Sequence, residues 1–198
     1  MNPILPEALQ RNLVLASRSP RRIEILQRLE FTFEVLPAGD AVEAAVSVRD
    51  PFERPIACAR YKASDVATKR PDALCVGADT GVILDGVLLE KPKDDEEAKR
   101  FLTALSGRAH TVVTGLALKR LSDDLELWDS EKTEVRFRTL DDDEIDRYVA
   151  SGEGRDKAGA YGIQGLGAAL VRSIDGCFYN VVGLPVALLF DLLKRAAA

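Results

Sequence analysis

The sequence lacks the features that mark membrane and secreted proteins. None of its apolar runs approaches the roughly 20 residues that a membrane-spanning helix needs. Residues 1–12 have neither the basic start nor the apolar centre of a signal peptide. Internal repeats and low-complexity linkers are also absent. We therefore expect a cytoplasmic protein that has no membrane partner.

An excess of positive charge is missing as well. The chain of 198 residues has 27 basic and 32 acidic residues, which gives a net charge of -5. Such a chain has no general electrostatic attraction for nucleic acid, so we expect no nucleic-acid partner. If the protein binds phosphate groups, a local cluster of cations has to hold them.

Cysteine and histidine are scarce. Cys58, Cys75 and Cys177 lack the paired spacing of a zinc site, and their surroundings favour reduced, buried thiols. His110 is the only histidine. A single histidine is more often a hydrogen-bonded structural residue than a catalytic one, so we assign it no catalytic role.

What the chain does contain is enough for one packed domain spanning residues 1–198, since 46% of its residues are hydrophobic and 30% are charged. Apolar periodicity and capping residues predict helices at 20–29, 50–70, 94–105, 141–151 and 185–197. Alternating or continuous apolar runs predict strands at 13–16, 31–36, 73–78, 82–84, 87–89, 111–118, 128–140, 168–171 and 179–182. Hairpins and crossovers together indicate an α/β fold built on a mixed sheet.

Residues 17–22 combine a helix start with two arginines. Ser19 can cap the helix and Pro20 suits its first position, so amide groups and the helix dipole favour an anion there. Arg21 and Arg22 are unfavourable at this helix end by some tenths of a kcal/mol. Their presence indicates that an anion such as phosphate offsets them, and the alternative is two solvated surface arginines.

Two further segments have the character of ligand-binding loops. A loop of about 14 residues, which contains Asp40 and Glu43, follows the strand predicted at 31–36, and loops of this length are more often functional than idle. Glycines are dense between Gly152 and Gly167. There the backbone can approach a ligand closely or turn sharply.

Six motifs, in the same order along the chain, resemble those of one protein family. They lie at residues 15–22, 77–80, 90–92, 106–110, 156–165 and 180–185. Over nearly its whole length the chain thereby resembles the Maf family of nucleoside triphosphate pyrophosphatases, also called septum formation inhibitor proteins. Arg21, Arg22 and the run at 156–165 resemble the branch that acts on dTTP and UTP, rather than the branch that acts on 7-methyl-GTP.

The resemblance implies an elongated α/β fold with a mixed sheet, flanking helices and a cleft between two lobes, similar to the inosine triphosphate pyrophosphatases. It implies an enzyme that hydrolyses dTTP and UTP, or modified pyrimidine nucleotides, to the monophosphate and pyrophosphate. The alternatives are a non-catalytic nucleotide-binding regulator of cell division and a pyrophosphatase for inosine or xanthosine triphosphate. A homodimer is implied as well, although no segment of the sequence identifies an interface.

The resemblance also implies a set of catalytic residues. Asp79, which follows the strand predicted at 73–78, matches the family's catalytic acid as metal ligand, general base or both. Lys62 and Lys91 match cations that surround the polyphosphate. The implied cofactor is Mg²⁺ or Mn²⁺, because carboxylate oxygens suit such hard ions. Glu43 would be the second metal ligand, with Asp40 as the alternative because the spacing of this loop departs slightly from the family pattern.

The substrate-binding residues implied by the same match are Ser17, Ser19, Arg21, Arg22, Thr80, Asp156, Lys157 and Gln164. The amide of Gln164 both donates and accepts, so it can read the edge of a pyrimidine base, assisted by Thr80 or Ser17. Asp156 and Lys157 belong either to the family's site loop or to a surface ion pair. Tyr161 either stacks on the base or packs against the sheet.

Overall fold

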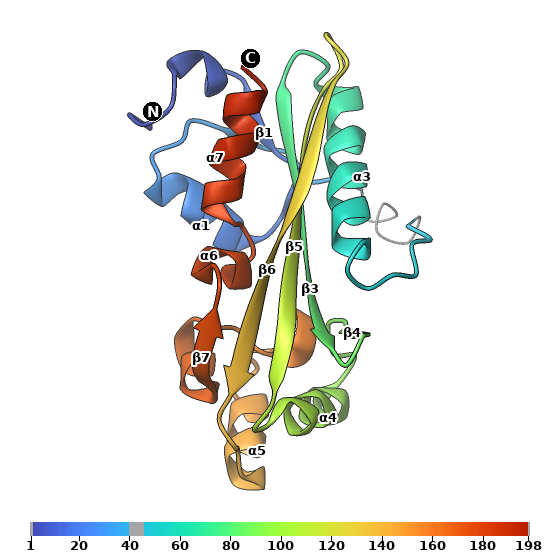
Figure 1. The fold of residues 1–198 in the computed structure, drawn as a ribbon, viewed down its shortest axis with the longest axis vertical. Helices are drawn as coiled ribbons and strands as arrows, with labels where there is room; N and C mark the ends of the chain where they lie inside the picture. Colours follow the sequence, from blue (N-terminus) through green and yellow to red (C-terminus); the bar gives the residue numbers. More distant parts are fainter. Residues whose placement is uncertain (1, 40–45, 198) are drawn as a thin grey trace.

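A mixed sheet of seven strands runs the length of the molecule and joins an upper to a lower lobe in the computed structural model (Figure 1). The structure describes residues 2–39 and 46–197. The strand order is β2-β1-β3-β5-β6-β7, and β4 pairs with β3. The strands are β1 (Leu13–Leu15), β2 (Glu34–Val35), β3 (Leu74–Leu84), β4 (Val87–Leu89), β5 (Ala109–Arg120), β6 (Leu125–Phe137) and β7 (Val171–Asp175). β1 is parallel to β2 and β3, and the other pairs are antiparallel.

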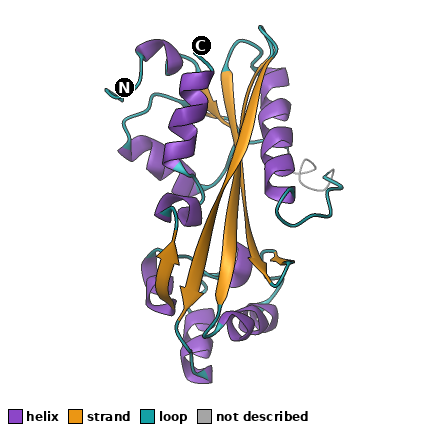
Figure 2. Cartoon of the chain, in the orientation of Figure 1, coloured by secondary structure: helices purple, strands orange, loops and turns teal. Residues whose placement is uncertain are grey.

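Helices flank both faces of this sheet (Figure 2). The α-helices are α1 (Pro20–Arg28), α3 (Arg54–Lys69), α4 (Asp95–Leu105), α5 (Asp142–Ala150), α6 (Phe178–Val182) and α7 (Val186–Arg195). Three short 3-10 helices are η1 (Glu7–Leu9), η2 (Ala158–Ala160) and η3 (Gly165–Leu170). Within the described ranges, each helix is too short or too polar to cross a lipid bilayer.

Helix α3 lies directly on one face of the sheet because two strand positions carry no side chain there. A Cβ atom on Gly77 of β3 would lie 2.0 Å from the carbonyl oxygen of Ala59 in α3. A Cβ atom on Gly115 of β5 would lie 2.5 Å from the Cα of Ile56. Only glycine permits so close an approach of two backbones, so these positions set the distance between α3 and the sheet.

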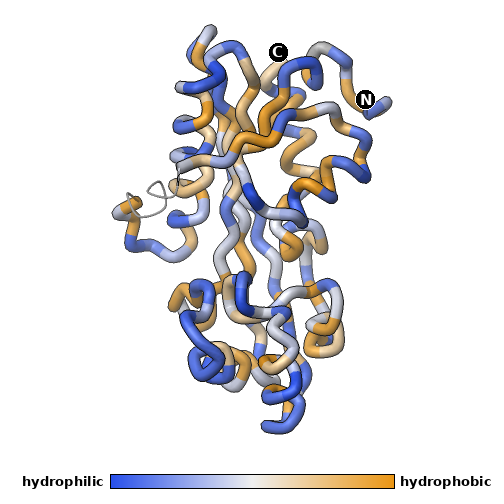
Figure 3. The backbone as a smooth tube through the Cα atoms, turned by 180° about the vertical axis from the view of Figure 1, so that it is seen from behind, coloured by the Kyte–Doolittle hydropathy of each residue, from blue (hydrophilic) through white to orange (hydrophobic). Residues whose placement is uncertain are grey.

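The opposite face and the lower lobe hold the two main hydrophobic clusters. In the upper lobe, Leu26 of α1 and Leu192 of α7 pack with Leu116 of β5, and all three are fully buried. In the lower lobe, Leu102 of α4 packs in one cluster with Phe137 of β6. Figure 3 shows hydrophobic segments in both lobes. Each buried side chain of this size contributes about 1.5–3 kcal/mol, so both lobes have a core of their own.

Several predictions from local sequence are confirmed. Helices α4 and α5 begin at acidic caps, since Asp94 accepts the Glu97 N–H at 2.7 Å and Asp141 forms a full capping box. The two-residue hairpin turn lies at Asp85 and Gly86, both with positive φ. Helix α7 and the antiparallel pair β5 and β6 are also present, and so is the mixed α/β sheet.

The prediction that a strand ends before Asp79 is wrong. β3 continues unbroken to Leu84, so the strands predicted at 73–78 and 82–84 are one strand. β5 pairs with it continuously from Cys75 to Ile83. Asp79 and Thr80 are the two half-buried residues in an otherwise buried strand, so they mark an opening beside β3 and not its end.

The strand predicted at 179–182 is also wrong, because these residues form helix α6. Gly183, with φ 116°, ends this helix in the left-handed region. Asn180 is fully buried, and its Nδ2 donates to the Val112 carbonyl at 3.0 Å and to Thr133 Oγ1 at 2.9 Å. These long-range hydrogen bonds stabilise a short helical turn that apolar alternation cannot reveal.

Other boundaries also differ from the prediction, and β6 spans Leu125–Phe137 where the prediction was 128–140. Helix α3 begins at Arg54, because the Asp50 carboxylate accepts the Phe52 N–H at 2.8 Å in a turn that precedes the helix. Residues 168–170 belong to η3, and β7 begins only at Val171. β2 covers two residues of the predicted 31–36, since its pairing with β1 is limited to Glu34–Val35.

Candidate active site

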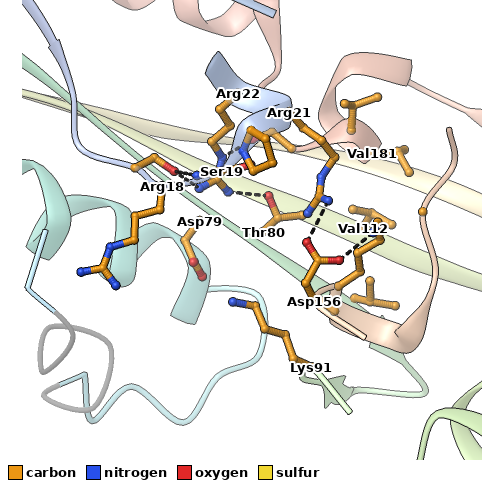
Figure 4. Close-up of a pocket in the computed structure, with 18 of the residues that line it drawn as sticks. Arg18, Ser19, Arg21, Arg22, Asp79, Thr80, Lys91, Val112, Asp156 and Val181 are labelled. Carbon is orange, nitrogen blue, oxygen red and sulfur yellow. Dashed lines mark hydrogen bonds and ion pairs between the residues drawn. The ribbon is translucent and has the colours of Figure 1, made fainter. Parts of the chain in front are cut away.

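One cavity of about 420 Å³ lies where the two lobes meet, and residues from both line it (Figure 4). Its lining includes every predicted site residue within the described ranges: Ser17, Ser19, Arg21, Arg22, Lys62, Asp79, Thr80, Lys91, Asp156, Lys157 and Gln164. The predicted metal ligand Glu43 and its alternative Asp40 lie outside the described residues. The two arginines and Asp79 therefore share a single cavity.

The guanidinium of Arg22 forms part of the cavity wall. Its Nε donates to the Gly183 carbonyl at 2.8 Å, and its Nη1 donates to the Ala78 carbonyl at 2.9 Å and to Ser17 Oγ at 3.2 Å. Its Nη2 donates to Thr80 Oγ1 at 3.0 Å. Four N–H groups of Arg22 thus hold α1 against β3 and the end of α6. Arg22 is buried, and these hydrogen bonds give it a structural role in the cavity wall.

The start of α1 differs in one detail from the prediction. Pro20 occupies the first helical turn as predicted, but the Ser19 side chain makes no capping hydrogen bond. The Ser19 N–H instead donates to Ser17 Oγ at 3.1 Å. The Ser19 N–H and Arg22 Nη1 both donate to lone pairs of Ser17 Oγ, and no described residue accepts the hydrogen of this hydroxyl. The Ser17 hydroxyl hydrogen can therefore be donated to an anion in the cavity.

Arg21 joins the two lobes across the cavity. Its Nη1 lies 3.3 Å from Oδ2 of Asp156, whose other carboxylate oxygen lies 2.6 Å from Lys157 Nζ. Burial raises the pKa of Asp156, but Lys157 and Arg21 outweigh it and hold this pKa below its ordinary value. Asp156 is thus a carboxylate that keeps both cations at the cavity, with α1 on one side and the glycine-rich loop on the other.

Asp79 lies between two lysines that come from different elements. Lys62 of α3 donates to Asp79 Oδ1 at 2.7 Å, and the two side chains are 12% and 24% exposed. Lys91 follows β4 and makes no hydrogen bond or ion pair with any described residue. Figure 4 shows its ammonium group on the same side of the cavity as the Asp79 carboxylate. The carboxylate is therefore oriented by one cation and accompanied by a second.

The edge of β3 is open at the site. The Ala16 N–H donates to the Val76 carbonyl at 2.8 Å, and the Ala78 carbonyl accepts from the α1 guanidinium. Even-numbered residues of β3 thus direct their backbone polar groups away from β5. β1 pairs no further than Val76, and β4 pairs only from Val82 onward. The backbone of Thr80 consequently faces the gap between β1 and β4.

A carboxylate that the sequence analysis missed holds the glycine-rich loop. Glu153 accepts two backbone N–H groups of η3, both at 2.8 Å, and the Tyr148 hydroxyl at 3.0 Å. Burial raises the pKa of Glu153, but these hydrogen bonds outweigh it and the pKa lies below its ordinary value. A Cβ atom on Gly165, where φ is +62°, would lie 2.5 Å from the carboxylate. This arrangement positions the exposed Gln164 beside the cavity.

For Tyr161, the packing alternative agrees with the geometry. The side chain is buried, its hydroxyl lies 2.7 Å from His110 Nε2, and its ring meets that of Phe137 edge to face at 4.7 Å. Burial lowers the pKa of His110 to about 4, so its ring is neutral near pH 7. Both residues support the wall of the lower lobe, and His110 has the structural role that we expected.

The described residues offer a divalent metal ion one carboxylate at this position. No cluster of three or more potential metal-binding side chains occurs within residues 2–39 and 46–197. Mg²⁺ commonly uses one or two protein carboxylates and takes its other ligands from substrate phosphates and water. Asp79 fits that kind of site.

A second cavity, of about 210 Å³, shares Asp79, Thr80 and Lys91 with the first. Its rim includes Arg54, whose Nη2 lies 3.5 Å from a carboxylate oxygen of Glu90. Asp79 and Lys91 thus border both cavities.

The fold and the site together define an α/β protein with a cavity in which a carboxylate lies among several cations. The family model described as Maf-like protein matches residues 12–196. The chain belongs to this family, so the predicted family membership is confirmed.

Three relatives that cover most of this chain carry the same name. A protein of Thermoanaerobacter sp. (strain X514), named dTTP/UTP pyrophosphatase, is 46% identical over 92% of this chain and 95% of its own length. A protein of Pyrococcus furiosus with the same name is 47% identical over 93% of this chain and 95% of its own length. A third protein with this name, of Geotalea uraniireducens, is 45% identical over 94% of this chain and 96% of its own length.

Two solved structures align with this chain at much lower identity. The Ham1 protein of Staphylococcus aureus aligns with a TM-score of 0.44 and 16% identity, over 63% of this chain and 71% of that one. A HAM1 protein from Coxiella burnetii aligns with a TM-score of 0.40 and 19% identity, over 63% of this chain and 72% of that one. The fold assignment therefore rests on the sheet and the helices described above.

Proposed function

We propose that this chain is a nucleoside triphosphate pyrophosphatase that hydrolyses dTTP and UTP to the monophosphate and pyrophosphate. The observation that carries the proposal is one cavity in which a carboxylate, Asp79, lies among cations from both lobes. The name shared by relatives at 45–47% identity supports the same activity. A protein that only bound nucleotide would need the cations but not the oriented carboxylate, which favours catalysis over regulation.

The triphosphate is held by groups that converge on the start of α1. Arg21 can form a two-pronged contact with phosphate oxygens, because its ion pair with Asp156 is partly exposed and open to exchange. The Ser17 hydroxyl and the amide groups at the start of α1 supply donors on the same side. Lys91, on the other side of Asp79, neutralises negative charge on the phosphates. The triphosphate therefore extends from the start of α1 past the Asp79 carboxylate to Lys91.

Hydrolysis follows from the position of Asp79. The carboxylate takes a proton from a water molecule whose oxygen attacks the α-phosphorus, and the bond from that phosphorus to the bridging oxygen breaks. Pyrophosphate leaves with the electron pair of that bond, and Lys91 stabilises its charge. Lys62 holds the carboxylate in place through its 2.7 Å hydrogen bond. A divalent metal held by Asp79, with Glu43 or Asp40 as a second ligand, would neutralise phosphate charge and lower the pKa of water.

The base occupies the opposite face of β3 from Asp79. Val82, Val112 and Val181 give this part of the cavity an apolar floor that suits a planar ring. Gln164, which is exposed, lines the same cavity. Its amide can pair with an edge of the pyrimidine, and this contact accounts for a preference among bases.

Pyrophosphate release from dTTP, UTP, CTP, 7-methyl-GTP and ITP, each with and without Mg²⁺ or Mn²⁺, tests the proposal. We expect metal-dependent release from dTTP and UTP and much slower release from the other three. Release from none of the five, together with tight binding of dTTP, would favour the regulator of cell division. Preferred release from ITP would identify an inosine triphosphate pyrophosphatase instead.

Two finer parts of the proposal concern the setting of the protein. We propose a homodimer, from the family resemblance, and a cytoplasmic location, because the sequence has no apolar run long enough to span a membrane. Sedimentation equilibrium tests the first, because a homodimer has twice the mass of a single chain. Fractionation of cells that produce the protein tests the second.

A further inference from the structure

Four groups form an unbroken row of hydrogen bonds from the cavity wall into the sheet. Arg22 Nη2 donates to Thr80 Oγ1 at 3.0 Å. Thr80 Oγ1 and Thr114 Oγ1 lie 2.9 Å apart, and Thr114 Oγ1 donates to the Asn180 carbonyl at 3.0 Å. Thr80 and Thr114 are direct partners in the pairing of β3 with β5, so their side chains project from the same face.

The direction of every hydrogen bond in this row is determined by counting protons. A hydroxyl has one hydrogen, and a carbonyl oxygen can only accept. The Thr114 hydrogen is used on the Asn180 carbonyl, so the hydrogen between the two threonines belongs to Thr80. The guanidinium of Arg22 has no lone pair to offer, and it can only donate to Thr80.

Thr80 therefore meets the cavity as an acceptor alone. Its hydrogen points to Thr114 and one lone pair faces Arg22, which leaves the second lone pair for a ligand. A phosphate oxygen in that position would be repelled, whereas an N–H group would be bound. Val82 and its strand partner Val112 lie two positions along from Thr80 and Thr114, on the same face of the sheet, and both line the cavity. The base, which suits this apolar surface, is therefore the part of the nucleotide that would meet the Thr80 hydroxyl.

The far end of the row is rigid. Asn180 Nδ2 donates to the Val112 carbonyl at 3.0 Å and to Thr133 Oγ1 at 2.9 Å, and Thr133 Oγ1 donates to the Cys177 carbonyl at 3.1 Å. Both Thr114 and Asn180 are fully buried. Hydrogen bonds to β5 and β6 thus hold Asn180 in place, with its backbone carbonyl oxygen against Thr114. If Thr114 donated its hydrogen to Thr80 instead, the buried hydrogen bond to this carbonyl would be lost.

We propose that Thr114 is a positioning residue for base selection: it makes the Thr80 hydroxyl an obligatory acceptor, and this selects nucleotides whose base presents N3–H. Uracil and thymine carry a hydrogen on N3, whereas N3 of cytosine is an acceptor. A cytosine nucleotide would bring a lone pair against the lone pair of Thr80. This inference rests on the proposed function, because it concerns which triphosphates that site accepts.

The test compares Thr114→Val with Thr114→Ser, using kcat/KM for UTP and for CTP. Valine keeps the shape of threonine but removes the hydroxyl, so Thr80 becomes able to turn its hydrogen toward the ligand. We expect the preference for UTP over CTP to fall about tenfold or more in Thr114→Val, mainly through better use of CTP. Thr114→Ser retains the hydroxyl, and we expect it to keep the wild-type preference. A purely structural role of Thr114 would lower both rates together and leave their ratio unchanged.

A measurement on the wild-type protein avoids any dependence on the folding of a variant. N3-methyl-UTP has a methyl group in place of the N3 hydrogen, and we expect its kcat/KM to be about tenfold or more below that of UTP. Equal use of the two nucleotides would overturn the inference. So would a Thr114→Val protein that keeps the full preference for UTP over CTP.

The proposed function can fail separately. If the wild-type protein releases no pyrophosphate from dTTP or UTP, that function is wrong and the inference falls with it. If the wild type hydrolyses both and only discrimination against 2′,3′-dideoxy-TTP changes in Thr114→Val, Thr80 meets the sugar and not N3. That result would overturn the inference alone.

Discussion

Asp79 and Thr80 are consecutive residues of β3, and their side chains lie on opposite faces of the sheet while both line the same cavity. Asp79 is hydrogen-bonded to Lys62 on the α3 face, and Thr80 to Thr114 on the other. This is achieved because the edge of β3 is open here, so that one ligand can extend around it. In the proposed enzyme, the edge separates hydrolysis on one face from base recognition on the other.

Replacement of Asp79 by asparagine tests its role in hydrolysis. An asparagine side chain keeps the shape of aspartate but cannot take a proton from water, so we expect turnover of dTTP to fall by about 10²- to 10⁴-fold. Steady-state pyrophosphate release measures this. Asp85→Asn, the same substitution in the exposed hairpin turn, is the control and should retain full turnover. Near-normal turnover of Asp79→Asn would exclude Asp79 as the general base.

The neighbouring arginines should differ in what they contribute. Arg22→Ala leaves the buried carbonyl groups of Ala78 and Gly183 without their donor, and we expect a loss of about 2–4 kcal/mol in the free energy of unfolding. Arg21→Ala removes only a partly exposed ion pair, whose contribution to stability is about 0–1 kcal/mol. Urea unfolding of both variants measures the difference, and KM for dTTP should rise in Arg21→Ala. An equal loss of stability in the two variants would contradict the assignment of Arg22 to the buried wall and of Arg21 to a partly exposed ion pair.

Gly77→Ala should weaken the packing of α3 on the sheet. The new Cβ atom would lie 2.0 Å from the carbonyl oxygen of Ala59, a backbone atom that cannot move without the helix. We expect a loss of about 1–3 kcal/mol in the free energy of unfolding. Gly39→Ala is the matched control, because its nearest neighbour would be the Asp65 carboxylate at 4.0 Å. A melting temperature unchanged in Gly77→Ala would show that α3 does not press on β3.

His110 should make the stability of the protein depend on pH. Burial lowers its pKa in the folded chain to about 4, whereas an unfolded chain has a histidine pKa near 6.5. As the pH falls from about 6.5 to about 4, the unfolded state takes up a proton that the folded state does not. Stability is therefore full above about 6.5 and falls through this window, by at most about 1.4 kcal/mol per pH unit from this residue.

Urea unfolding at several pH values measures the effect, with His110→Gln as the control. The difference in stability between wild type and this variant should shrink as the pH falls, because glutamine does not titrate. A difference that stays constant between pH 7 and pH 4 would mean that His110 is protonated equally in both states.

The elements that the sequence predicted correctly are those whose signals are local. Asp94 and Asp141 cap helices that follow them directly, and Asp85-Gly86 turns a hairpin within four residues. The six family motifs also identified residues that converge on one cavity. In each case the information lies in neighbouring residues or in a motif, and neither requires knowledge of the fold.

Sequence by itself thus determined the class of the fold and the limits of the capped helices, and through the family motifs it identified most of the polar residues at the cavity. Tertiary structure alone decided that Asp79 lies inside a continuous strand and that residues 178–182 form a helix. It also decided that the Arg22 guanidinium forms hydrogen bonds to backbone carbonyls in the cavity wall. It also decided the direction of the hydrogen bond between Thr80 and Thr114, which depends on a carbonyl 66 positions beyond Thr114. The physical reason is that strand pairing and buried hydrogen bonds join distant segments, and no local pattern of residues specifies their partners.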